Sequence, residues 1–220
     1  MSKPTVPITL STEAIEDLIY DARSGDFDAL KEDISAQSKA HNCPEALIVA
    51  SAIDMEDEAE GGTGCCLLHY PAANGNFEIL NYLLQTLTQA QEHVAQVINH
   101  RNHSGNTPLH WAALNTHLEC VKALVETGAD LTVKNDAGLD AIFLAERTAW
   151  STEEGEKKEA EQARAEAAGE EDIGEMSQGR QVVEWLLSSD KGGELEHGVS
   201  AGETSNSAAA GDAMDEDEKK

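Results

Sequence analysis

"GNTPLHWAALNTHLECVKALVETGAD", residues 105–130, has the most regular pattern in the chain. Leu109, Ala112 and Ala113 share one face of a helix, and a second apolar helical stretch follows after a break at Thr116. The spacing therefore predicts two short helices joined as a hairpin.

The ends of this hairpin carry the residues that helix termini prefer. The Thr107 hydroxyl is suited to cap the first helix, and Pro108 lacks an N–H that the first turn does not need. Gly128 stands where a left-handed residue ends the second helix. The order of turn, Thr-Pro-Leu-His, two helices and Gly-Ala-Asp resembles the ankyrin repeat. The resemblance implies that His110 links one repeat to the next, in place of a metal-binding or catalytic role.

A single hairpin of this kind cannot bury its apolar face alone, so neighbours are expected. Related patterns occur at residues 14–34, 62–87 and 135–147, and residues 44–53 predict an additional helix. Residues 88–100 lengthen the outer helix or the loop of the second repeat. We therefore expect an all-α ankyrin-repeat solenoid of about four helix-turn-helix repeats over residues 12–189, after a flexible N-terminus at residues 1–11.

The fourth repeat is interrupted before its second helix, which is predicted at residues 179–187. The insertion at residues 151–177 has ten acidic and three basic residues, and Glu153 and Lys157 have favourable helical spacing. It is either an exposed helix or a disordered loop. Residues 190–220 lose all periodicity, and their nine acids and three bases predict a disordered acidic tail.

The formal net charge of −27 is far larger than solubility requires. Such a charge disfavours nucleic acid as a direct partner, because phosphates would be repelled. Acidic runs often only solvate a surface, but here they are attached to a binding scaffold, which favours a basic protein partner.

The sequence contains no recognisable catalytic or cofactor-binding motif. There is no phosphate-binding glycine loop or nucleophile elbow, and the cysteines and histidines lack the paired spacing of a zinc site. We expect no enzyme activity, metal or cofactor. The N-terminus has no signal-peptide pattern and no stretch is long enough to cross a bilayer, so we expect an intracellular chain with reduced cysteines and no membrane contact.

Three stretches together, at residues 21–30, 104–126 and 135–146, with the acidic C-terminus, resemble the fungal ankyrin-repeat chaperones dedicated to the small-subunit ribosomal protein S-three, a KH-domain protein. Thr116 departs from that pattern, which has glycine between the helices. The resemblance implies an ATP-independent, monomeric chaperone of the cytoplasm and nucleus that escorts a basic client and meets nuclear import machinery through it. A signalling or transcription adaptor or inhibitor and an acidic histone-type chaperone are the alternatives.

In ankyrin proteins the fingers and the solvent side of the first helices line a concave binding face. Trp111 is either part of that face or an inter-repeat packing residue, whereas Ala112 and Ala113 are expected to be buried. Mapped onto this sequence, the predicted partner-binding residues are Tyr70, Asn74, Arg101, His103, Ser104, Asn106, Trp111, Leu114, Asn115, Lys134, Asp136, Leu144 and Arg147.

Overall fold

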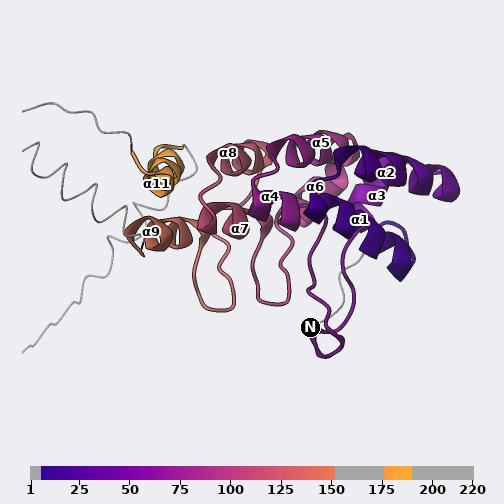
Figure 1. The fold of residues 1–220 in the computed structure, drawn as a ribbon, viewed down its shortest axis with the longest axis horizontal. Helices are drawn as coiled ribbons and strands as arrows, with labels where there is room; N and C mark the ends of the chain where they lie inside the picture. The colour runs from indigo at the N-terminus through magenta and orange to yellow at the C-terminus, as the bar shows by residue number, and fades with distance from the viewer. Residues whose placement is uncertain (1–5, 152–175, 190–220) are drawn as a thin grey trace, which may run out of the picture.

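The structure is a computed structural model that describes residues 6–151 and 176–189, and these residues form two rows of helices (Figure 1). The predicted all-α solenoid is confirmed: the described residues contain no strand, only an isolated antiparallel bridge between Ile53 and Cys66. The inner row consists of α1 (Thr12–Ser24), α4 (His69–Asn74), α7 (Pro108–Leu114) and α9 (Ala141–Ser151). The outer row contains α2 (Phe27–His41), α5 (Phe77–Leu87), α8 (Leu118–Thr127) and α11 (Gln178–Ser188).

Additional helices extend the first two repeats. The helix predicted at residues 44–53 is present as α3 (Glu45–Ser51), and it packs between α2 and α5 in the outer row. The lengthened second repeat is completed by η2 (Thr88–Ala90) and α6 (Gln91–Ile98). A short 3-10 helix, η1 (Glu58–Glu60), lies at the first long finger.

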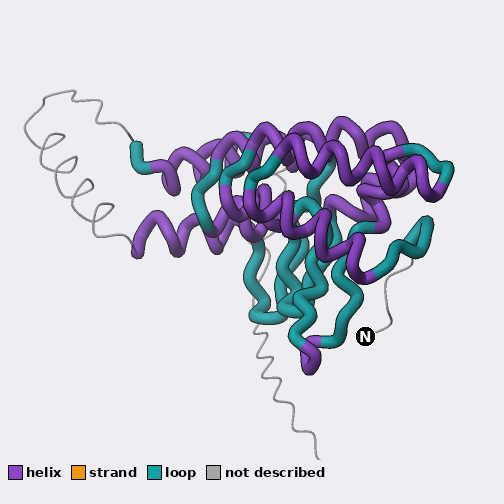
Figure 2. The backbone as a smooth tube through the Cα atoms, turned by 45° about the vertical axis from the view of Figure 1, so that its right-hand side comes forward, coloured by secondary structure: helices purple, strands orange, loops and turns teal. Residues whose placement is uncertain are grey.

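The hydrophobic core lies between the two rows. Leu18, Leu80 and Leu109 are fully buried or nearly so, and Ala112 and Ala113 are completely buried, as the sequence predicted. Small residues at the last two positions let the helices approach closely, and larger ones would overpack the core. Loops at residues 52–68, 99–107 and 128–140 extend from the inner row as fingers that lie side by side (Figures 1 and 2).

Two buried histidines join each repeat to the next finger. In α7 the Thr107 N–H donates to His110 Nδ1 (3.1 Å), which leaves the His110 Nε2–H to donate to the Leu139 carbonyl (3.1 Å). His69 repeats the arrangement one repeat earlier, with its Nε2–H donating to the Asn106 carbonyl (3.0 Å). The structural role predicted for His110 is therefore observed.

Burial keeps both rings neutral. It lowers the pKa of His69 to about 4, although the hydrogen bond to the Asn106 carbonyl acts in the opposite direction. The pKa of His110 is also lowered, again mainly by burial. A neutral ring is required here, because Nδ1 must accept a hydrogen bond while Nε2 donates one.

The turn between the two helices of a repeat requires a left-handed residue. Gly25 (φ 83°) and Gly75 (φ 73°) supply it in the first two repeats. In the third repeat Thr116 occupies the same position with φ 59°. A β-branched residue is strained in this region, because its Cβ approaches the neighbouring carbonyl.

The N-terminal prediction requires a correction. Residues 1–11 were expected to be flexible, but Val6 and Ile8 pack against the core and Leu10 is only 6% exposed. The Ile8 N–H also donates to Ser51 Oγ (3.1 Å). Alternating apolar residues at positions 6, 8 and 10 place one face of this stretch on the core, with a period of two that differs from the helical spacing of the repeats.

The predicted tail and nearly all of the predicted insertion lie outside the described residues; only Ser151, Met176 and Ser177 of the insertion are inside. Among the described helices, none is both long and apolar enough to cross a membrane.

Replacing Thr116 by glycine should stabilise the protein. A left-handed conformation costs an L-residue roughly 1–2 kcal/mol, and part of this gain is offset by the larger backbone entropy of glycine in the unfolded chain. We expect Thr116→Gly to raise the free energy of unfolding by about 0.5–1 kcal/mol in denaturant titrations. Thr116→Ala, which keeps a Cβ, is the control and should change stability less. A glycine variant no more stable than the alanine variant would contradict this explanation.

Stability should fall on mild acidification because of His69. The folded pKa of about 4 lies below the ordinary value of 6.5, so between these values the unfolded chain binds a proton that the folded chain does not. This group therefore lowers the free energy of unfolding by up to about 1.4 kcal/mol per pH unit as pH drops from 6.5 towards 4. His69→Gln should show a flatter dependence in denaturant titrations at pH 6.5 and 5, since the other groups contribute equally to both proteins. If the free energy of unfolding depends on pH equally in the wild type and in His69→Gln, His69 is not the cause of the loss of stability.

Candidate functional site

The inner helices present an aligned row of side chains. Tyr20, Tyr70, Trp111 and Leu144 each stand two residues after the apolar residue that anchors their helix in the core. Tyr20 is 69% exposed, Tyr70 and Trp111 are half-buried, and Leu144 is only 6% exposed. Leu144 must therefore be removed from the predicted binding face. Sequence position alone could not show this, because burial of Leu144 depends on what packs around α9.

Trp111 both packs against the preceding repeat and contributes to the surface. Its ring meets the His69 ring edge-on at 5.2 Å and the Tyr70 ring at 5.6 Å between centroids. The Arg23 guanidinium lies 5.5 Å from the centroid of Tyr70, which continues the contact to α1. Trp111 is therefore an inter-repeat packing residue whose ring also stays partly accessible to solvent on the predicted binding face. Leu114 on the same helix is 38% exposed.

Polar side chains at the ends of the inner helices form hydrogen bonds between repeats. The Asn74 amide donates to the Arg23 carbonyl (3.0 Å), and the Asn115 amide donates to the Ala73 carbonyl (2.8 Å). The Thr148 hydroxyl donates in the same way to the Leu114 carbonyl (3.1 Å). Asn74 and Asn115 are exposed, but each already donates an amide N–H to the backbone of the preceding repeat.

The finger residues predicted to bind a partner also connect neighbouring fingers. Arg101 forms an ion pair with Asp136 (2.7 Å), in which each side chain is 45% exposed. The His103 Nδ1 lies 3.0 Å from the Gly62 carbonyl, and Asn135 donates to Asn106 Oδ1 (2.9 Å). The fingers are therefore fixed relative to one another.

Three predicted residues remain directed to solvent. Ser104, Lys134 and Arg147 are exposed, and the Ser104 carbonyl accepts the Asp136 N–H (3.2 Å). Two exposed cations therefore lie at the end of the stack that contains α9, Lys134 on the last finger and Arg147 on α9 itself.

The first finger is acidic. Residues 56–60 contribute four exposed carboxylates, and Asp54 fixes the base of this finger. Burial raises the pKa of Asp54, but hydrogen bonds from the backbone and hydroxyl of Thr63 outweigh it and lower the pKa overall. This finger therefore carries a concentrated negative charge at neutral pH.

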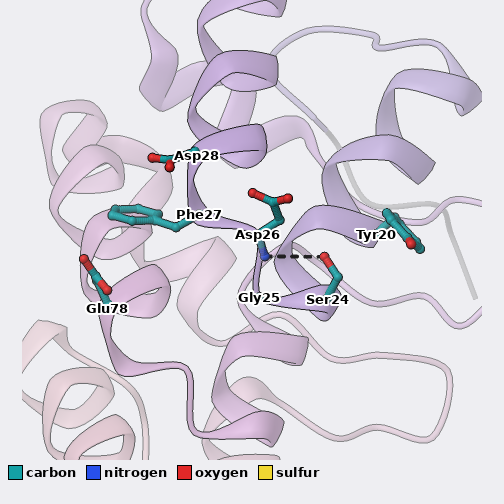
Figure 3. Close-up of a pocket in the computed structure, with 7 residues that line it drawn as sticks. All are labelled: Tyr20, Ser24, Gly25, Asp26, Phe27, Asp28 and Glu78. Carbon is teal, nitrogen blue, oxygen red and sulfur yellow. Dashed lines mark hydrogen bonds between the residues drawn. The ribbon is translucent and has the colours of Figure 1, made fainter.

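A second acidic feature lies where α1 turns into α2. Figure 3 shows an open hollow in which the Asp28 carboxylate lies near the Phe27 ring, with Asp26 on the side of Ser24 and Glu78 of α5 also at the lining. Asp26 also caps α2, since its Oδ1 accepts the Ala29 N–H (3.1 Å). The remaining lining residues are Tyr20, Ser24 and Gly25.

The described residues hold no group of three or more histidine, cysteine or acidic side chains placed to bind a metal ion. Burial raises the pKa of the Cys66 thiol to about 12 and that of Cys120 to about 11, so both thiols stay protonated at neutral pH. All four cysteines are free.

Sequence reasoning missed the exposed aromatic residues of the inner helices. Tyr20 on α1 is 69% exposed. Phe143 and Trp150 on α9 are 47% and 61% exposed, although large aromatic residues are usually buried. Their spacing of seven residues on one helix is the signal that places them on a common face.

Comparisons with known proteins agree with this architecture. Residues 18–135 match the family model for ankyrin repeats in three copies. The ankyrin repeat-containing protein YAR1 of Saccharomyces cerevisiae is 34% identical over 142 residues, which cover 63% of this chain and 65% of that protein. The alignment therefore spans less than two thirds of the yeast relative. Mouse synphilin-1 is 35% identical over 81 residues, which cover 37% of this chain and 8% of synphilin-1.

A solved structure is similar over a larger share of its own chain. A chain in the crystal structure of the yeast ribosomal protein Rps3 in complex with its chaperone Yar1 matches with a TM-score of 0.56 and 35% identity. The match covers 68% of this chain and 93% of that chain. Because the ankyrin model covers more than half of the 220 residues, and the stacked hairpins follow it, the chain belongs to the ankyrin-repeat family.

Proposed function

We propose that this protein is an ATP-independent chaperone that binds and solubilises a newly made basic ribosomal protein of the small subunit, of the S3 type, and escorts it to ribosome assembly. The observation that carries the proposal is the similarity to the Yar1–Rps3 structure, at 35% identity over 93% of the matched chain. The proposed function requires binding of the client and no catalysed reaction. We propose that the protein acts in the cytoplasm and the nucleus.

The concave face provides apolar anchors for such a client. Trp111 and Leu114 lie on α7, in the middle of the inner row, and the aromatic contact with Tyr70 extends the apolar surface towards α1. Binding energy in protein interfaces is concentrated in a few residues of this kind, and tryptophan and tyrosine are enriched among them. The fingers hold this face in a fixed shape, which reduces the entropy lost on binding.

The charge of the protein suits a basic client. A ribosomal protein without its RNA lacks counter-charge, and an acidic solenoid supplies it. The exposed carboxylates of residues 56–60 and the net charge of −27 attract such a client from a distance. Electrostatic attraction of this kind accelerates association and allows release to RNA, while apolar anchors determine specificity.

The direct test is solubility of the client. A purified S3-type small-subunit ribosomal protein is diluted into physiological salt with and without an equimolar amount of this chain, and soluble client is measured after centrifugation. We expect the chain to keep the client soluble without nucleotide. Core histones serve as a second basic substrate: equal protection of histones would indicate a general acidic chaperone, and no protection of the ribosomal protein would refute the proposal.

Truncating Leu114 should weaken client binding without weakening the fold. Its side chain is 38% exposed, so Leu114→Ala removes an anchor from the surface with little loss of buried contact. We expect the dissociation constant to rise at least about tenfold, a loss of about 1.4 kcal/mol, while the unfolding midpoint is almost unchanged.

Trp111→Ala should lower both the affinity for the client and the unfolding midpoint, because the ring also packs against His69 and Tyr70. Lys122→Ala on the outer helix α8 is the control and should leave both unchanged. Unchanged affinity of the Leu114 variant, measured by titration calorimetry, would show that the client does not bind this face.

Association with the client should depend strongly on salt. The Debye length shrinks from ~30 Å at 0.01 M to ~8 Å at 0.15 M ionic strength, which screens attraction between separated charges. We expect the association rate measured by stopped-flow fluorescence to fall several-fold over this range, with a smaller change in the dissociation rate. An association rate independent of salt would remove electrostatic attraction from the mechanism.

A further inference from the structure

The last inner helix has an uncovered aromatic face. Phe143 is 47% exposed and Trp150 is 61% exposed, and Arg147 is exposed between them. Spacings of four and seven residues place these side chains on one side of α9, which we call the α9 end face. Helix α9 packs against α7 and α11 on its other sides.

Phe143 occupies the place that a histidine holds in the preceding repeats. It stands 33 residues after His110, whose side chain reaches the next finger through the Leu139 carbonyl. A phenyl ring cannot form such a bond. The outward surface of a terminal repeat is normally polar, because it faces water. Two large exposed aromatic residues at this position instead form the kind of patch that marks a protein contact.

The charge of the surrounding chain identifies the kind of partner. Residues 152–175 are attached to α9 at Ser151 and to α11 through Met176, and residues 190–220 follow Ser189. Together these two segments contain nineteen acidic and six basic residues. Figure 1 places α9 and α11 at the end of the stack opposite α1, so this charge is attached next to the α9 end face. A second copy of the chain would be repelled, whereas a basic partner would be attracted.

We propose that the α9 end face is a second docking surface for the basic client, and that it binds a client segment with one or two apolar side chains among lysine and arginine residues. The inference rests on the proposed function, because it assigns both surfaces to one client. Phe143 and Trp150 supply the apolar contact, and the stem of Arg147 extends it. The net charge of −27 attracts the basic residues of the client.

The test compares variants of the full chain. Phe143→Ser with Trp150→Ser removes both rings at exposed positions, and Phe77→Ser removes a 42% exposed ring from the outer helix α5 as the matched control. Affinity for a purified S3-type ribosomal protein is measured by titration calorimetry, and thermal unfolding is recorded for every variant. We expect the dissociation constant of the double variant to rise at least about tenfold, with the midpoint and the Phe77→Ser affinity near the wild-type values.

Each contrary outcome has a distinct meaning. If the wild type binds the client and the double variant binds it with the same affinity, the second docking surface is overturned and the proposed function stays intact. Absence of binding by the wild type would overturn the proposed function. A midpoint lowered by many degrees would show that the protein's own chain covers the face. A dimer of the wild type in sedimentation, lost in the double variant, would assign the face to a second copy, and both of these results would overturn the proposal.

Discussion

The middle of the solenoid depends on one kind of buried contact, a histidine that connects the second and the third repeat each to the next finger. His110 accepts a hydrogen bond from the backbone at the start of its own helix and donates one to the Leu139 carbonyl. His69 does the same towards Asn106. Both rings must stay neutral, and burial ensures this by lowering the pKa of each. Because the fingers are attached through these contacts, their position follows from the packing of the inner helices.

The surface proposed for binding is formed by residues that also stabilise the stack. Trp111 packs on His69 and Tyr70 while part of its ring stays accessible. The Asn115 amide is exposed, yet its donor is used by the Ala73 carbonyl. Such double use makes the face rigid before any partner arrives, so little conformational entropy is lost on binding. A chaperone that holds its client without ATP benefits from a face prepared in this way.

The two chemical properties needed for a basic client are separated in space. Apolar anchors lie on the inner helices, whereas four exposed carboxylates lie on the first finger at residues 56–60. Long-range attraction therefore does not require charges to be buried in the contact, which would cost desolvation energy.

The sequence by itself determined the repeating hairpins, the cap at Thr107, the turn glycines and the extra helix α3, because each depends on residues within a few positions of one another. The tertiary structure decided which side chains are free. Leu144 was predicted to face a partner and is buried, and Val6–Leu10 was predicted to be flexible but packs on the core. Phe143 and Trp150 are exposed at the end of the stack. Exposure depends on the neighbour that each helix receives, and in a solenoid that neighbour comes from the adjacent repeat, beyond the few positions over which local spacing applies.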